Sequence, residues 1–340
     1  MHGETLVHFS LNSLTRLLCR CTALLALLAA TAGAASAQYP DRPITITAGF
    51  APGGTSDVAA RILAERLQKS LGVAVVVDNK PGAGGSIAAA ATAAAAPDGY
   101  RIMLSDPGAF AINPIMQPQN AKYDPLSDFT PIALVGQSPL ILVVPSSKPF
   151  ATVAELNQYL RAAAGRATYA SSGPAGITQF GAEVYLKRAG DLSAVHVPYR
   201  GGAPMMEAVA KGEADFGMAV LASAVPLISS GAVRALALAA PGATPLVAKV
   251  PLLDQLGITG TTVTSWVIMI GPKGLPAEIV KRLNAAINDA LAEPDVKERL
   301  LKAGIETYPP ATPAETGDYL KQDVERYRSF QSELGERLTR

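Results

Sequence analysis

Four glycine-containing turns stand directly in front of segments with a helical pattern, and this placement is suited to binding an anion. The turns span residues 49–54, 81–85, 171–176 and 199–203. The first N–H groups of a helix have no partner inside the helix and lie at the positive end of its dipole, so such ends attract anions. Glycine and proline also make tight turns for structural reasons alone. Four such turns in one chain nevertheless favour a carboxylate site that needs no lysine or arginine.

Polar side chains near these turns have both a structural and a functional interpretation. Asp57, at the start of the first predicted helix, either complements the helix dipole or contacts a ligand or water. Asp106 follows a predicted strand in an Asp-Pro-Gly sequence that is common turn chemistry. His196 lies in a strand-like sequence, where a lone histidine is more often packed than basic, and Trp266 is expected in the core or in a cleft wall.

Named catalytic and nucleotide-binding motifs are missing from the sequence. The run Gly82 to Ile87 begins like a dinucleotide fingerprint but has isoleucine where the third glycine or alanine belongs. Neither a phosphate-binding Gly-x-x-x-x-Gly-Lys-Ser/Thr loop nor a Gly-x-Ser-x-Gly nucleophile elbow occurs. The sequence therefore offers no signature of a dinucleotide-binding protein, a phosphate-binding-loop protein or a serine hydrolase.

The first 37 residues have the pattern of a signal peptide. Arg16 and Arg20 precede the apolar run 23–30, and Ala35-Ser36-Ala37 supplies the small residues expected before a cleavage site. We expect cleavage after Ala37 and a periplasmic mature protein. A lipoprotein is not expected, because both cysteines precede the apolar run.

Removal of this leader narrows the chemistry that remains. Both cysteines and two of the three histidines lie within it, so zinc sites built from Cys and His, disulfides and cysteine nucleophiles are excluded, and no metal or cofactor is expected. The formal net charge falls from +1 to zero, and no long run of one sign occurs, which argues against a nucleic-acid or anionic-membrane partner. No long exposed apolar stripe is evident, so we expect a monomer.

Strand-like and helix-like segments alternate along the chain. The predicted strands are 44–48, 73–77, 101–105, 167–170, 195–198, 214–219, 233–239 and 265–270. The predicted helices are 57–70, 86–96, one that opens at the capping box Thr152–Glu155 and ends at Gly165, 178–188, 204–211, and three at the C-terminus, the last starting at Thr312–Glu315. This alternation predicts an α/β protein with parallel sheet, and 340 residues suffice for two domains.

Six collinear stretches resemble a known family, the periplasmic receptors of tripartite tricarboxylate transporters (the Bug, or TctC-like, family). They are residues 39–44, 52–57, 79–85, 97–100, 197–201 and 265–266, and their order and spacing agree with that family over the whole mature chain. The resemblance implies a type II periplasmic binding-protein fold, with two α/β domains joined by two crossover segments around a ligand cleft. The expected domains are 38–140 plus 262–340 and 141–261, with crossovers near 138–142 and 261–265.

The resemblance also implies a ligand site that grips one carboxylate with two turns and ordered waters. One domain would contribute Phe50, Pro52, Gly53, Gly54, Thr55 and Asp57, with Gly84, Gly85 and Ser105 beside them. The other would contribute Ser171, Ser172, Gly173, Thr178, Tyr199 and Gly201.

Two positions depart from the family pattern and bear on the ligand. Gln179 stands where many relatives have histidine, and Ala219 lies in Met218-Ala219-Val220 where relatives often have Phe-Asp-Asn. Both changes remove polar groups from the expected cleft. They predict a ligand with one carboxylate and a less polar remainder, such as an aromatic or short aliphatic acid, and an Ala219→Asp variant that binds it more weakly.

The resemblance implies capture of a small organic acid and its delivery to the membrane permease subunits of such a transporter. One alternative keeps the receptor but has it present its ligand to a membrane sensor kinase, which neighbouring permease genes would argue against. Another is an exported hydrolase or isomerase that uses Asp57 or His196, which the missing nucleophile–base pair disfavours.

Overall fold

The computed structural model describes residues 39–119 and 121–338, except for the side chain of residue 336. The expected signal peptide and its cleavage site lie outside the described residues. The chain divides into two units, 1–41 and 42–340, and the sheet and helices belong to the second unit. None of the described helices is both long and apolar enough to cross a membrane.

The strands follow the expected order, with some that the sequence did not reveal. They are β1 (Ile44–Ala48), β2 (Val75–Asn79), β3 (Arg101–Ser105), β4 (Phe129–Pro145), β5 (Thr168–Ser171), β6 (Val195–Pro198), β7 (Phe216–Val220), β8 (Val233–Ala239), β9 (Thr264–Pro272) and β10 (Glu306–Thr307). The predictions for β1, β3, β6 and β8 are confirmed to the residue, whereas β2 begins two residues later than predicted. The long strand β4 was not predicted.

The helices of eight or more residues also follow the expected order. They are α2 (Thr55–Leu71), α3 (Ser86–Ala93), α5 (Val153–Ala163), α6 (Ile177–Arg188), α7 (Gly202–Lys211), α8 (Leu221–Ser229), α9 (Ala277–Ala292), α10 (Pro294–Lys302) and α11 (Pro313–Leu334). Shorter helical segments include η2 (Ala83–Gly85), η3 (Gly108–Ile112), α4 (Asn113–Met116) and η6 (Gly335–Leu338). Helix α8 was not predicted.

Helix ends follow from local sequence. Both predicted capping boxes are confirmed: the hydroxyl oxygens of Thr152 and Thr312 accept hydrogen bonds from Glu155 and Glu315 N–H, and each glutamate reaches back to the cap. Helix α2 ends at Gly72, whose left-handed backbone (φ 73°) is the conformation that glycine adopts most easily. These caps explain why the helix starts were predictable.

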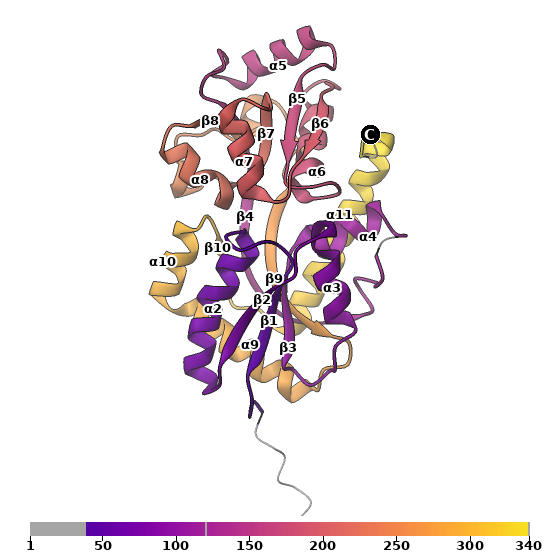
Figure 1. Ribbon diagram of the computed structural model, residues 1–340, viewed down its shortest axis with the longest axis vertical. Coiled ribbons are helices and arrows are strands. Elements are labelled where there is room, and N and C mark those ends of the chain that lie inside the picture. Colours follow the sequence, from indigo (N-terminus) through magenta and orange to yellow (C-terminus); the bar gives the residue numbers. More distant parts are fainter. Residues whose placement is uncertain (1–38, 120, 339–340) are drawn as a thin grey trace, which may run out of the picture. The chain divides into compact units, whose positions relative to one another are not determined.

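The strands form two groups that share β4 (Figure 1). The first sheet has the order β2-β1-β3-β9-β4, and the second has β4-β7-β5-β6, while β8 and β10 also pair with β4. Strand β4 pairs with β9 as far as Pro139 and with β7 and β8 from Leu140 onward. The expectation of parallel sheet is confirmed for β1–β3 and β5–β7 but wrong for the predicted strands β8 and β9, which run antiparallel to the strands they pair with, as does the unpredicted β4.

Each sheet sends the carboxyl ends of its parallel strands into turns. Strand β1 leads into the turn 49–54 and helix α2, β5 leads into the turn 172–176 and helix α6, and β6 leads into the turn 199–201 and helix α7. Ligands of open α/β sheets bind outside the carboxyl ends of the strands. These turns are therefore the first place to look for a site.

Candidate functional site

A cavity of about 250 Å³ lies where the turns of the two sheets meet. It is lined by Phe50, Ala51, Pro52, Gly53, Gly54, Thr55, Ser56, Asp106, Ser172, Ile177, Thr178, Arg200, Gly201, Gly202, Ala203, Pro204, Val220, Ser223, Ser265 and Val267. Of the residues expected from the sequence, this set brings together Phe50, Pro52, Gly53, Gly54, Thr55, Ser172, Thr178 and Gly201.

Three helix N-termini contribute to the cavity wall. The first hydrogen bonds inside α2, α6 and α7 run from Val58, Phe180 and Met205 N–H to the carbonyls of their glycine caps. The N–H groups that precede them, on residues 55–56, 177–178 and 202–203, belong to residues that line the cavity. Three helices of this length supply partial positive charge without a basic side chain. The arrangement is suited to holding a carboxylate.

Asp57 fastens the first turn instead of lining the cavity. Its carboxylate accepts hydrogen bonds from Gly53 N–H at 2.9 Å and Asn79 Nδ2 at 2.9 Å, and it pairs with the Arg61 guanidinium at 2.8 Å. Burial by itself raises the pKa of Asp57, but the bonds from Arg61, Gly53 and Asn79 hold it below its usual value. Asn79 also donates to the Phe50 carbonyl at 3.0 Å. Both ends of the turn are thereby fixed by groups outside the cavity.

The glycines at 84 and 85 lie behind this turn rather than in the cavity wall. Asn113 donates from Nδ2 to the carbonyls of Ala83 and Gly84 at 2.8 and 3.1 Å. Gly85 has φ +93°, and a Cβ there would stand 2.7 Å from the Cβ of Ala109. This turn therefore supports its neighbour by close packing.

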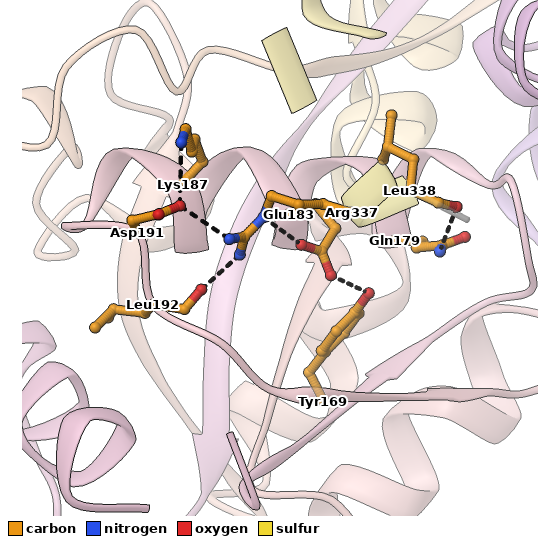
Figure 2. A network of polar contacts seen from close by, with 8 residues as sticks. All are labelled: Tyr169, Gln179, Glu183, Lys187, Asp191, Leu192, Arg337 and Leu338. Carbon is orange, nitrogen blue, oxygen red and sulfur yellow. Dashed lines mark hydrogen bonds and ion pairs between the residues drawn. The ribbon is translucent and has the colours of Figure 1, made fainter. Parts of the chain in front are cut away.

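The turn after β5 is fixed from its own helix. Thr178 Oγ1 accepts a hydrogen bond from Ser172 N–H at 2.8 Å, and the two hydroxyl groups lie 2.9 Å apart. Gln179 Oε1 accepts from Ala175 N–H at 2.7 Å, while its Nε2 lies 3.4 Å from the Leu338 carbonyl (Figure 2). The Gln179 side chain is buried and does not line the cavity. Its amide joins the turn to the C-terminal segment.

Ser171 and His196 form a hydrogen-bonded pair below this turn. Ser171 Oγ lies 2.6 Å from His196 Nε2, donates to the Gly173 carbonyl and accepts from Gly173 N–H. The His196 ring stacks on Tyr169 with centroids 5.0 Å apart. Ser171 is fully buried, and neither Ser171, Gly173 nor His196 lines the cavity. The pair holds the shape of the turn and has no access to a substrate there.

The half-buried position of His196 predicts a pH dependence of stability. Burial lowers the pKa of His196 from 6.5 to about 4. Between these values the unfolded chain binds more protons than the folded chain, so the free energy of unfolding falls as the pH drops through this window. Above about pH 6.5 the effect is absent. We expect urea unfolding at about pH 4.5 and about pH 7 to show a smaller loss for His196→Gln than for the unaltered protein. Equal losses would contradict this assignment.

The remaining expected site residues lie away from the cavity. Tyr199 lies in the turn before α7, but its hydroxyl points to Glu213 Oε2 at 3.5 Å. Ser105 is fully buried with no hydrogen-bond partner for Oγ among the described residues. Ala219 packs with Ile141, Met205 and Leu238 in an apolar cluster. The expectation that Ala219 faces the cleft is not met, since alternation along β7 turns Val220 to the cavity instead.

Two charged residues of the cavity wall were not predicted as site residues. Arg200 is an exposed side chain in the turn before α7, and Asp106 is a buried one that follows β3. Arg200 precedes Gly201 in one of the glycine turns that the sequence analysis identified, and Asp106 directly follows the predicted strand 101–105. Position after a strand was the available signal for Asp106, but the common turn chemistry of Asp-Pro-Gly made it a weaker candidate than Asp57.

A network of ion pairs and hydrogen bonds ties the C-terminal segment η6 to α6 (Figure 2). Glu183 accepts from Tyr169 Oη at 2.7 Å through Oε1 and pairs with Arg337 Nε at 3.1 Å through Oε2. Arg337 also pairs with Asp191 at 3.0 Å and donates to the Leu192 carbonyl. Helix α11, which packs on β4, leads directly into η6. The network therefore joins α11 to α6, the helix that follows the cavity turn 172–176.

Trp266 is a core residue, as one of the two expectations stated. It is fully buried, and its Nε1 donates to Asp323 Oδ2 at 2.6 Å. Burial raises the pKa of Asp323 to about 6, although the bonds from Trp266 and Arg326 oppose that shift. The residues on either side of Trp266, Ser265 and Val267, line the cavity.

Among the described residues no group of three or more His, Cys, Asp or Glu side chains is placed to hold a metal ion.

Comparison with known proteins identifies a receptor family. Residues 59–335 match the family described as "Tripartite tricarboxylate transporter family receptor". The chain is 32% identical over 332 residues to Protein BugT of Bordetella pertussis (strain Tohama I), which covers 96% of this chain and 99% of that protein.

Solved structures show the same fold. R. palustris Rpa4515 with adipate aligns with a TM-score of 0.84 and 30% identity, covering 88% of this chain and 99% of that one. MatC (Rpa3494) from Rhodopseudomonas palustris with bound malate aligns with a TM-score of 0.81 and 29% identity, covering 86% and 99%. The α/β periplasmic binding-protein fold expected from the sequence is confirmed.

Proposed function

Because the chain belongs to the tripartite tricarboxylate transporter receptor family, we propose that it is a solute-binding protein that captures a small organic acid through a carboxylate. The observation that carries this proposal is the convergence of three helix N-termini on one cavity. The relatives with adipate and malate support the same class of ligand. The exposed guanidinium of Arg200 adds positive charge to the wall.

The rest of the cavity wall favours a ligand whose remainder is less polar. Apolar side chains of Phe50, Ile177, Val220 and Val267 face the space beside the helix starts. A cavity of about 250 Å³ suits an acid of modest size. An aromatic or short aliphatic acid therefore fits this wall better than a tricarboxylate, since the additional carboxylates of the latter would lie against apolar groups.

The family suggests how the receptor works in the cell. We expect the leader 1–37 to be removed after Ala37, the mature protein to work in the periplasm, and the loaded receptor to deliver its acid to membrane permease subunits. We further propose that 38–140 plus 262–340 and 141–261 act as two lobes that close around the acid by a hinge motion. The change of partners along β4 between Pro139 and Leu140 supports a hinge there.

A thermal-shift screen tests the proposal directly. The mature protein is heated with mono-, di- and tricarboxylates, amino acids and aromatic acids. A ligand at about 100 times its Kd adds about 2.7 kcal/mol of stability, which raises Tm by several degrees. We expect shifts confined to carboxylates, greatest for acids with one carboxylate and an apolar remainder.

A pair of tryptophan variants on α7 controls for non-specific effects. Ala203 is exposed and lines the cavity, so Ala203→Trp should fill the space and abolish the shift without loss of fold. Glu207 is exposed on the same helix outside the cavity, so Glu207→Trp should leave the shift unchanged. Equal shifts in both variants would place binding elsewhere and overturn the proposed site.

A further inference from the structure

The carboxyl group of Asp106 is half satisfied by the protein. Its Oδ1 accepts hydrogen bonds from Gly108 N–H at 2.8 Å and Ala109 N–H at 3.2 Å. Its Oδ2 has no hydrogen-bond partner among the described residues, although Asp106 is only 7% exposed. The residue lines the cavity. A buried carboxyl oxygen without a partner is costly unless something else satisfies it.

The charge balance of the cavity determines which form of this carboxyl group a bound acid would favour. Asp106 is the one acidic side chain among the lining residues, and Arg200, the one basic side chain there, is exposed. Burial raises the pKa of Asp106 to about 7, with the two N–H bonds opposing the shift. A carboxylate that enters the same small cavity disfavours a second negative charge and raises this pKa further. The complex therefore favours a neutral Asp106.

We propose that Asp106 binds the captured organic acid in its protonated form, donating a hydrogen bond from Oδ2 to an oxygen of the ligand. This assignment rests on the proposed function. Because Oδ1 already accepts two N–H bonds, Oδ2 is the oxygen that carries the proton, and the ligand supplies an acceptor that the described residues do not provide. At a pH above the pKa of the free side chain, binding therefore takes up a proton. Specificity follows, since a ligand with an oxygen at this point is preferred over one with an ammonium group.

Other titratable groups near Asp106 are few. Tyr123, which interacts electrostatically with Asp106, has its pKa raised to about 12 by burial and stays neutral. From α11, which packs against the segment after Asp106, the buried acid is Asp323, bound to Trp266 and Arg326. The strand β9, helices α3 and α4 and segment η2 carry no charged side chain.

Affinity as a function of pH tests the assignment. The probes are benzoate and hexanoate, whose carboxylates stay ionised from about pH 6 to about pH 8. The pKa of Asp106 in the protein without ligand is about 7. Affinity should therefore fall about tenfold from about pH 6 to about pH 8, because the neutral fraction of Asp106 falls by that factor. Titration calorimetry at about pH 8 in two buffers of different ionisation enthalpy should show nearly one proton taken up per ligand.

Asp106→Asn is the decisive variant. Asparagine keeps an oxygen for the two N–H groups and a neutral donor in place of Oδ2–H, so affinity should stay near the pH 6 value of the unaltered protein and become independent of pH. Asp323→Asn is the matched control, since it removes the other buried acid with a raised pKa while keeping an acceptor for Trp266. It should retain the tenfold dependence.

Several results would overturn the assignment. Affinity that is constant or rises with pH, or an Asp106→Asn variant that binds weakly at both values, would mean that Asp106 binds as a carboxylate or not at all. If the pH dependence of affinity disappears in Asp323→Asn, the group that takes up the proton is Asp323 on α11 and not Asp106. If no acid of the screening panel shifts Tm at either pH for any variant, the proposed function fails, and the assignment fails with it.

Discussion

Replacement of Glu183 by alanine is expected to lower the free energy of unfolding by about 3–5 kcal/mol, as for other buried ion pairs that lose one partner. Glu183 is 6% exposed and holds both Tyr169 Oη and the Arg337 guanidinium (Figure 2). Alanine would leave the buried phenol without an acceptor and Arg337 without its least exposed partner. Urea unfolding measured at neutral pH gives the difference.

Two further variants separate the buried charge from simple loss of contact. Glu183→Gln keeps an acceptor for Tyr169 and loses only the ion pair, so it should lie between the unaltered protein and Glu183→Ala. Arg188→Ala removes the exposed pair with Glu333, which joins α6 to α11 at 2.7 Å, and should cost less than about 1 kcal/mol. If Glu183→Ala lowers the free energy of unfolding by less than about 1 kcal/mol, the buried ion pair and the Tyr169 hydrogen bond do not stabilise the protein as expected.

Replacement of Ala219 by aspartate is expected to disrupt the fold rather than to weaken binding selectively. Ala219 is fully buried between Ile141, Met205 and Leu238. A carboxyl group there has no solvent and must displace apolar side chains, so we expect a loss of about 4 kcal/mol or more, with the acid kept neutral. Thermal unfolding and soluble yield measure the effect.

Ser223→Asp provides the contrast. Ser223 is half-buried and lines the cavity two residues into α8, so a carboxylate there should leave Tm within a few degrees but repel an acidic ligand. Normal stability together with weakened binding for Ala219→Asp would restore the first expectation for this position and contradict the packing described for β7.

Local signals in the sequence predicted much of the fold. Capping boxes and glycine turns are short patterns whose physics is complete within a few residues, so the starts of α5 and α11 could be predicted. Strand β4 could not, because Pro131, Gly136 and Pro139 interrupt its apolar pattern and its pairing depends on β9, more than 100 residues away in sequence.

The candidate site shows the same division. Asp57 follows a glycine turn and Asp106 opens an Asp-Pro-Gly sequence, and the sequence analysis assigned only Asp57 to the site. In space Asp57 binds Arg61, Asn79 and Gly53 N–H, whereas one oxygen of Asp106, in the cavity wall, has no partner in the part of the chain that the structure describes. Likewise, a shift of one residue on β7 decides whether Ala219 or Val220 faces the cavity. Contacts with residues distant in sequence decide which aspartate keeps an unpaired oxygen and which β7 side chain faces the cavity. A short stretch of sequence does not contain this information.

Sharing β4 between both sheets also constrains the order in which the protein can fold. Strands β1–β3 reach β4 only through β9, which comes late in the chain, while β7 and β8 pair with the other half of β4. A nascent chain that ends before residue 264 can assemble the second sheet but leaves one edge of β3 and half of β4 unpaired. Contacts of such long sequence separation slow folding. The first sheet is therefore expected to gain protection from hydrogen exchange last, in a single step with the docking of β9.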